Sequence, residues 1–165
     1  MSELLSAEIA GQIEALQNRY IDALDSKDMS AWLATFDERD GASYILTTLD
    51  NEQQNHPLGL MLDDCRARLI DRVTYITKIW AGTFQDYRSR HFTQRVASVQ
   101  VEKDVFDVRS NFSVCYTPVD TGESKLLTCG VYLDRILLTT LGARFMTKKV
   151  VIDTSVLPQY VVYPL

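Results

Sequence analysis

Histidine is scarce in this 165-residue chain, and that scarcity excludes several kinds of catalytic centre. Only His56 and His91 are present, and none of the three cysteines has a histidine within three positions, so the close Cys and His pairs of a Rieske cluster are missing. A facial iron triad needs two histidines and a carboxylate, whereas these two histidines lie far apart on different predicted elements. The seven glycines are scattered singly and form no phosphate-binding loop. We therefore expect no metal or cofactor in this chain.

Basic charge and long apolar runs are also lacking. The net charge of −5 gives no positive field for nucleic acid, so we expect no nucleic-acid partner. No apolar run approaches the roughly 20 residues of a membrane span, and the first residues do not resemble a signal peptide. The odd set of three cysteines, without close spacing, indicates free thiols rather than disulfides: Cys65, Cys115 and Cys129. These absences favour a cytoplasmic protein without membrane contact.

The length predicts one domain over residues 1–165, and the pattern predicts an α+β fold that begins with helices at about 7–36. Residues 7–25 form one apolar helical stripe of Ile9, Ile13, Leu16, Tyr20 and Leu24. A shorter helix carrying Trp32 and Phe36 follows, with Asp28 or Ser30 as its N-cap.

Residues 57–91 contain a further predicted helix. Its apolar face comprises Cys65, Leu69, Val73, Ile76 and Trp80. Asp63 is the expected N-cap, Asp64 lies at the positive end of the helix dipole, and residues 50–56 ahead of it form a polar loop. We expect this helix to fill the concave side of the sheet.

The predicted sheet comprises a strand at 42–49 and a four-strand antiparallel meander mainly within 88–153. Phe106, Val108, Phe112, Val114 and Tyr116 alternate with polar residues, which indicates one buried and one wet face. An extended apolar tail, residues 154–165, contains two prolines. It either packs along its own sheet or forms a subunit contact; in the second case, deleting residues 157–165 weakens assembly.

Two features admit a chemical interpretation. His91 and an aspartate within hydrogen-bond reach would suffice for proton abstraction or dehydration, and the candidate acids are Asp22, Asp25, Asp37 and Asp40. Acids near helix ends are more often caps or solvated charges. Arg88 and Arg90 beside His91 could bind an anion, but they are explained more simply as ion-pair partners of acids on the nearby helix or on another subunit.

The order of several short motifs carries a family resemblance. These are Trp32 and Phe36, the run Tyr44, Ile45 and Leu46, Asp50 and Asn51 ahead of Pro57 and Leu58, Asp63 and Asp64 with Leu69, Asp71, Arg72 and Val73, Arg90 and His91, residues 130–134, and the ending 153–158 with 163–165. The chain resembles the small (β) subunits of aromatic-ring-hydroxylating oxygenases, most nearly the group that acts on benzoate, anthranilate and salicylate. Their fold is the cystatin-like, nuclear-transport-factor-2-like (NTF2-like) roll.

The resemblance implies a non-catalytic structural subunit without a redox centre. Its partner would be a large α subunit with a Rieske [2Fe-2S] cluster and a mononuclear iron, commonly as three α and three β chains with β–β contacts, supplied with NAD(P)H-derived electrons by a ferredoxin or reductase. The candidate interface and orienting residues are Asp64, Arg72, Arg90, His91, Tyr160 and Tyr163. Two alternatives remain: a free-standing dehydratase or isomerase that uses His91 and an aspartate, and a ligand-binding or purely structural roll dimer.

Overall fold

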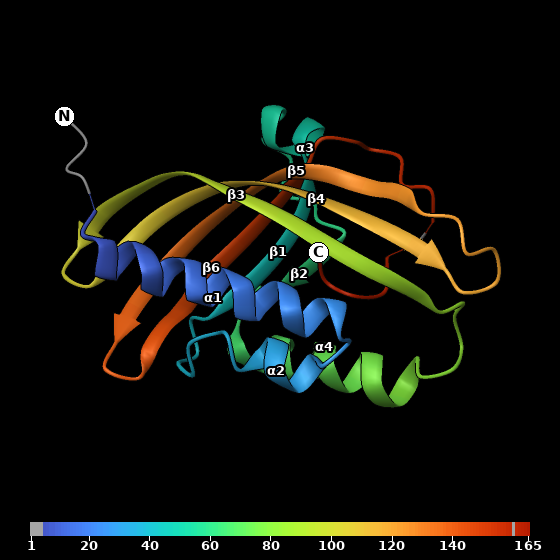
Figure 1. The fold of residues 1–165 in the computed structure, drawn as a ribbon, viewed down its shortest axis with the longest axis horizontal. Helices are drawn as coiled ribbons and strands as arrows, with labels where there is room; N and C mark the ends of the chain where they lie inside the picture. The colour runs from blue at the N-terminus through green and yellow to red at the C-terminus, as the bar shows by residue number, and fades with distance from the viewer. Residues whose placement is uncertain (1–4, 160) are drawn as a thin grey trace.

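A long, curved sheet forms the wall of the molecule (Figure 1). The computed structural model describes residues 5–159 and 161–165. Its six strands lie in the order β2-β1-β6-β5-β4-β3, and their bounds are β1 Ser43–Thr48, β2 Met61–Asp63, β3 Tyr87–Glu102, β4 Val105–Pro118, β5 Lys125–Thr139 and β6 Gly142–Ile152. Neighbours are antiparallel, except that β1 is parallel to β6. The predicted α+β roll with its four-strand meander is confirmed.

The long helix α1 (Ala7–Asp25) lies along the concave face of the sheet (Figure 1). The hydroxyl of Ser6 accepts from the main-chain N–H of Ile9 and caps its first turn. The apolar stripe packs against the sheet, with Ile13, Leu16 and Tyr20 fully buried. The expectation that the helix after residue 63 fills the concave side was therefore wrong, because the longer stripe of α1 occupies that place.

The predicted helix after residue 63 is α4 (Arg66–Thr74), continued by a π-helical turn, η1 (Tyr75–Ile79). It packs against α2, β1 and β2 near one end of the sheet. Asp63 is not its N-cap, contrary to the sequence prediction: Cys65 holds that position, and Asp63 ends β2 and pairs with Arg72. A buried carboxylate gains more from a guanidinium than from capping N–H groups that water can reach.

Two short helices complete the fold. Helix α2 (Met29–Leu33) begins at Asp28, whose carboxylate accepts from the N–H of Ala31. The predicted polar loop at 50–56 is wrong in part, because α3 (Leu49–Gln53) lies there, capped by the hydroxyl of Thr48. Acidic residues in its first turn favour this helix through the dipole.

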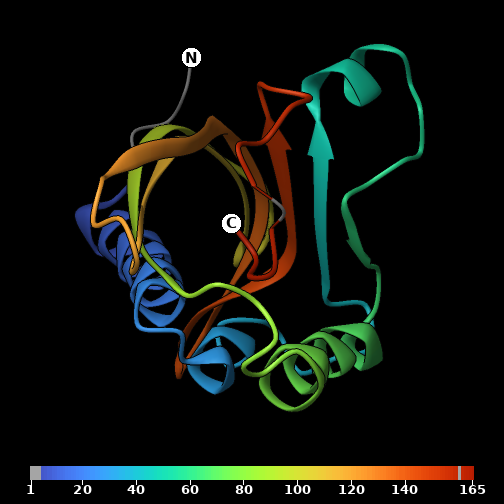
Figure 2. The same ribbon diagram turned by 90° about the vertical axis from the view of Figure 1, so that its right-hand side faces the viewer.

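The end of the tail lies inside the roll. Figure 2 looks into the ring formed by the sheet and α1, with the C-terminal residues within it. Leu165 and Val162 belong to the buried core, whereas Val156 is 78% exposed. The apolar character of residues 161–165 is thus satisfied largely within the chain itself.

Candidate functional site

The end of α1 and the start of β3 bring one of the predicted acids to His91. Asp25 Oδ1 lies 2.6 Å from His91 Nδ1, and Asp25 Oδ2 accepts from the main-chain N–H of His91 at 3.1 Å. Burial alone would raise the pKa of Asp25, but hydrogen bonds from His91 and Ser89 outweigh it and hold the pKa below its ordinary value. The histidine side chain is 2% exposed. The pair is oriented as an acid–base pair would be, although it is enclosed.

Lys27 lies beside this pair. Its ammonium donates to Ser89 Oγ at 3.2 Å and lies 4.1 Å from the ring centroid of Tyr87 and 4.2 Å from that of Tyr163. Burial lowers the pKa of Lys27 to about 8, against the opposing charges of two nearby aspartates. A weakly hydrated cation held between two aromatic faces thus connects the tail to the interior of the roll.

The tail ends against two tyrosine hydroxyls. Tyr20 donates to the main-chain oxygen of Leu165 at 2.6 Å, and Tyr44 accepts from the Leu165 N–H at 2.9 Å. Both rings are fully buried, and burial raises the pKa of each phenol. The interior next to the Asp25–His91 pair is therefore filled by the protein's own chain.

A second polar group lies deeper under α1. Lys148 of β6 and Asp134 of β5 have fully buried side chains, and the ammonium lies 3.0 Å from both carboxylate oxygens. The amide of Gln17 donates to the same carboxylate. Burial lowers the pKa of Lys148 to about 8 and raises that of Asp134, each against the attraction of the other charge.

Sequence analysis missed this pair, although strand parity contains a signal. Asp134 shares its face of β5 with Tyr132 and Ile136, and Lys148 shares its face of β6 with Val150 and Ile152, so both charges occupy inward positions. The Lys148 ammonium also lies 3.7 Å from the Tyr132 ring centroid. A charge at an inward position predicts a buried partner.

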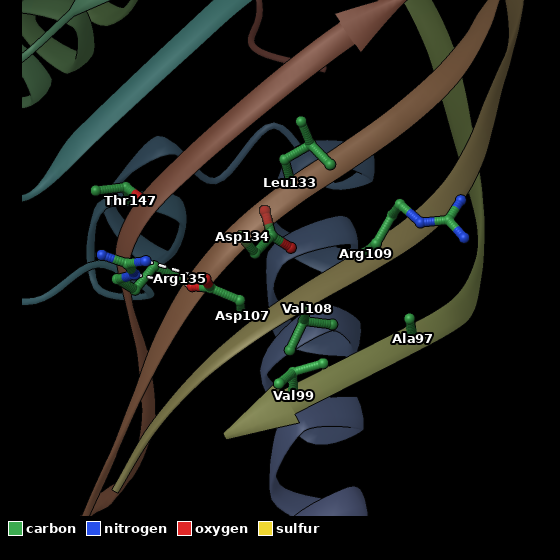
Figure 3. Close-up of a pocket in the computed structure, with 9 residues that line it drawn as sticks. All are labelled: Ala97, Val99, Asp107, Val108, Arg109, Leu133, Asp134, Arg135 and Thr147. Atoms are coloured by element: carbon green, nitrogen blue, oxygen red, sulfur yellow. Dashed lines mark hydrogen bonds and ion pairs between the residues drawn. The ribbon is translucent and has the colours of Figure 1, made fainter. Parts of the chain in front are cut away.

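The opposite face of the sheet carries an open hollow of about 360 Å³ (Figure 3). Cross-strand pairing places its outward residues side by side on four strands: Ala97 and Val99 on β3, Asp107 and Arg109 on β4, Leu133 and Arg135 on β5, and Thr147 on β6. Figure 3 shows the Arg135 guanidinium bonded to the Asp107 carboxylate. Among the described helices, only α3 reaches this face, where its Glu52 pairs with Lys149 of β6, so the hollow itself is open.

The structure distributes the predicted interface residues widely. Asp64 is exposed and pairs with Arg68, whereas Arg72 makes a two-bond pair with Asp63 at 2.9 and 3.1 Å. Arg90 is exposed on β3, and its guanidinium donates to the main-chain oxygen of Ser89. His91 is buried and Tyr163 partly buried. Tyr160 lies outside the described residues.

No metal-binding group forms in the part of the chain that the structure describes. Nowhere within residues 5–159 and 161–165 do three His, Cys, Asp or Glu side chains come together as metal ligands. The three cysteines are free thiols on separate elements. In the same residues, no helix is long and apolar enough to cross a membrane.

Comparison with known proteins identifies the family of this chain. The model of a family described as ring hydroxylating beta subunit matches residues 19–159. The chain belongs to this family. The small subunit of anthranilate 1,2-dioxygenase from Burkholderia cepacia is 31% identical over 87% of this chain and 86% of that protein.

Two other relatives agree. A β subunit of the terminal oxygenase component of terephthalate 1,2-dioxygenase from a Comamonas species is 26% identical over 93% of this chain and 97% of its own. The crystal structure of the benzoate 1,2-dioxygenase β subunit from Burkholderia mallei has a TM-score of 0.69 and 25% identity, covering 93% of each chain. The chain is thus a β subunit of an aromatic-ring-hydroxylating dioxygenase, as the sequence resemblance implies.

Proposed function

We propose that this β subunit is non-catalytic and holds the large α subunits of a dioxygenase in register, while the α subunits oxidise an aromatic acid with O2. The α partner carries the Rieske [2Fe-2S] cluster and the mononuclear iron, and a ferredoxin or reductase delivers NAD(P)H-derived electrons to it in the cytoplasm. Three α and three β chains form the complex. Three relatives named for anthranilate, terephthalate and benzoate support an aromatic acid as substrate.

One observation carries this proposal: the described chain fills the inside of its roll and leaves the outside of its sheet bare. A free-standing enzyme of this fold needs interior space for its substrate. Here α1 and residues 161–165 occupy that space, whereas β3 forms a sixteen-residue edge with Phe92 and Val99 about 60% and 57% exposed. Long exposed edges with apolar residues favour association with another chain.

The arginines supply orientation in this assembly. Arg90 projects from the edge strand and has no carboxylate partner among the described residues, so it is free to pair with an acid of an adjacent subunit. Arg72 acts indirectly, because its pair with Asp63 fixes α4 against β2. Exposed pairs are worth roughly 0–1 kcal/mol each, so Arg90 sets geometry more than affinity.

The free-standing dehydratase or isomerase remains the second candidate, since Asp25 and His91 do form a hydrogen-bonded pair. A base of this kind acts only if substrate reaches within about 3 Å of it. The buried imidazole and the inserted tail oppose such access in the described conformation.

Native mass spectrometry with iron analysis separates the two candidates. The tagged chain is purified alone and after co-expression with the α chain. The subunit function predicts a large iron-bearing complex only in the second preparation, and an Arg90→Ala chain that assembles less efficiently than an Arg95→Ala control. A self-sufficient chain that ignores α and turns over a hydroxylated substrate, with loss on His91→Ala, would reject it.

A further inference from the structure

The last residues of the chain are held in the roll as a ligand is held. Residues 161–165 form neither helix nor strand. Leu165 is fixed by two side-chain hydroxyls, Tyr20 from α1 and Tyr44 from β1, rather than by a strand ladder. Its side chain is 2% exposed. Proteins recognise small molecules in the same way, with hydroxyls bound to a polar atom and a buried surface around an apolar group.

The walls of this pocket are positioned by contacts that do not involve the tail. The Tyr20 ring packs edge-on against Phe36 and Phe145, with centroids 6.4 and 5.4 Å apart. The Tyr44 ring packs edge-on against Trp32 at 5.7 Å. Contacts outside the tail therefore hold both rings in position.

Further polar atoms line the same interior. Neither the hydroxyl of Tyr132 nor Nε2 of His91 bonds to any described residue, and both atoms are buried. The Tyr132 ring lies edge-on to Tyr20 at 6.1 Å, and His91 is held by Asp25 through its other nitrogen. Buried polar atoms in proteins nearly always have partners, so two such atoms indicate a site built for polar groups beyond those of the tail.

An open hollow lies beside Tyr163 of the tail. A hollow of about 460 Å³ is lined by Lys27, Phe84, Asp86 and Tyr163, together with residues of η1 and α2. Tyr163 is only partly buried and packs edge-on against Phe84 and Tyr87. The hollow therefore adjoins the tail at Tyr163, next to the ammonium of Lys27.

We propose that residues 161–165 are an exchangeable internal ligand covering a binding site for a small carboxylate or carbonyl compound with a branched or aromatic apolar body. The Tyr20 hydroxyl donates to the oxygen that now belongs to Leu165, and the Tyr44 hydroxyl accepts from an N–H and donates to the same oxygen at 3.4 Å. Tyr132 and His91 bind further polar groups. The inference does not depend on the α partner, because every residue involved lies in this chain.

Amide hydrogen exchange on the intact chain tests whether a small molecule can replace residues 161–165 in the roll. N-acetyl-leucine is the competing probe. The amides of residues 161–163 and 165 exchange at least tenfold faster than those of β4 and β5, and the probe accelerates them further without affecting the strands. N-acetyl-leucinol lacks the carboxylate oxygen and requires at least a tenfold higher concentration. Exchange of 161–165 only at the rate of the central strands, or indifference to the probe, overturns the proposal.

Two variants sharpen the test. Leu165→Ala weakens the internal ligand and lowers the effective probe concentration at least tenfold, whereas the exposed matched control Val156→Ala leaves it unchanged. Equal behaviour of the two variants contradicts the proposal. If Leu165→Ala does not fold, the wild-type exchange measurement still decides. These results do not require assembly, so the failure of this inference is distinguishable from failure of the subunit function.

Discussion

Replacing Lys148 by methionine tests how the buried charges contribute to stability. The substitution keeps the length of the side chain and its contacts with the aromatic rings, but it removes the ammonium that lies 3.0 Å from both oxygens of Asp134. The carboxylate is then fully buried, and the Gln17 amide is its remaining hydrogen-bond partner among the described residues. An unpaired buried charge is far costlier than a lost surface contact.

The expected loss follows from that isolation. Breaking a buried pair by removing one partner costs about 3–5 kcal/mol, a large share of the roughly 5–15 kcal/mol that stabilises a typical domain. For a chain of this size, each kcal/mol shifts Tm by roughly 2–4 °C, so Tm falls by roughly 6–20 °C. Urea unfolding monitored by tryptophan fluorescence measures the free energy directly.

A second substitution separates charge from packing. Adding Asp134→Asn to Lys148→Met removes the orphaned charge and keeps an oxygen for the Gln17 amide, so at least about 2 kcal/mol returns. Arg135→Ala, which breaks the half-exposed pair with Asp107, is the control and costs about 0–1 kcal/mol. A loss below about 1 kcal/mol for Lys148→Met, or strictly additive effects in the double variant, would refute the reasoning.

Three further perturbations have defined outcomes. Arg72→Ala leaves Asp63, which is 5% exposed, without its two-bond partner and should cost about 1–3 kcal/mol in urea unfolding; an unchanged midpoint contradicts the pairing. Gly130→Ala brings a Cβ to 2.1 Å from a main-chain oxygen of β6 and should lower the free energy of unfolding by about 3 kcal/mol or more. The control Gly11→Ala has open space around its Cβ and should raise it by about 0.5–1 kcal/mol. Equal Tm values for the two variants would contradict the close approach at Gly130. Lys148 has a pKa of about 8 in the folded chain and 10.5 in the unfolded chain, so between these values the unfolded chain binds more protons and stability rises with pH. Above about pH 10 stability falls, because the tyrosines ionise more readily in the unfolded chain. A monotonic decline of the unfolding free energy from pH 8, measured in urea, excludes this linkage.

Local patterns were sufficient for most of the fold. The stripe from Ile13 to Leu24 and the alternation from Phe106 to Tyr116 each report one buried face, and the structure has a helix and a strand there. Hydrophobic periodicity is a reliable signal here because many residues of one face contribute to it, and a single polar residue among them leaves the period recognisable.

The wrong N-cap and the tail, whose direction the sequence left open, both depended on contacts outside their own segments. Asp63 precedes a helical pattern as an N-cap does, but Arg72 places it in a strand. Leu165 ends an apolar tail that local sequence cannot direct inward or outward, and its place depends on hydroxyls from Tyr20 and Tyr44, more than a hundred positions away in the chain. Contacts between separate segments leave no periodic pattern in the sequence, so neither hydrophobic periodicity nor secondary-structure propensity predicts them.

The Asp25–His91 pair shows why a candidate catalytic pair cannot be judged from its members alone. Sequence supplied four acids for His91, and the fold selected the one at the end of α1, at 2.6 Å. The same fold then inserts its tail into the interior, so the environment that orients the pair also separates it from solvent. In the described conformation the pair joins the end of α1 to β3, and the imidazole is buried, so its contact has a structural role there. The outer face of the sheet is exposed without any rearrangement of the chain, and the proposed contact with the α subunit is therefore available in the described conformation.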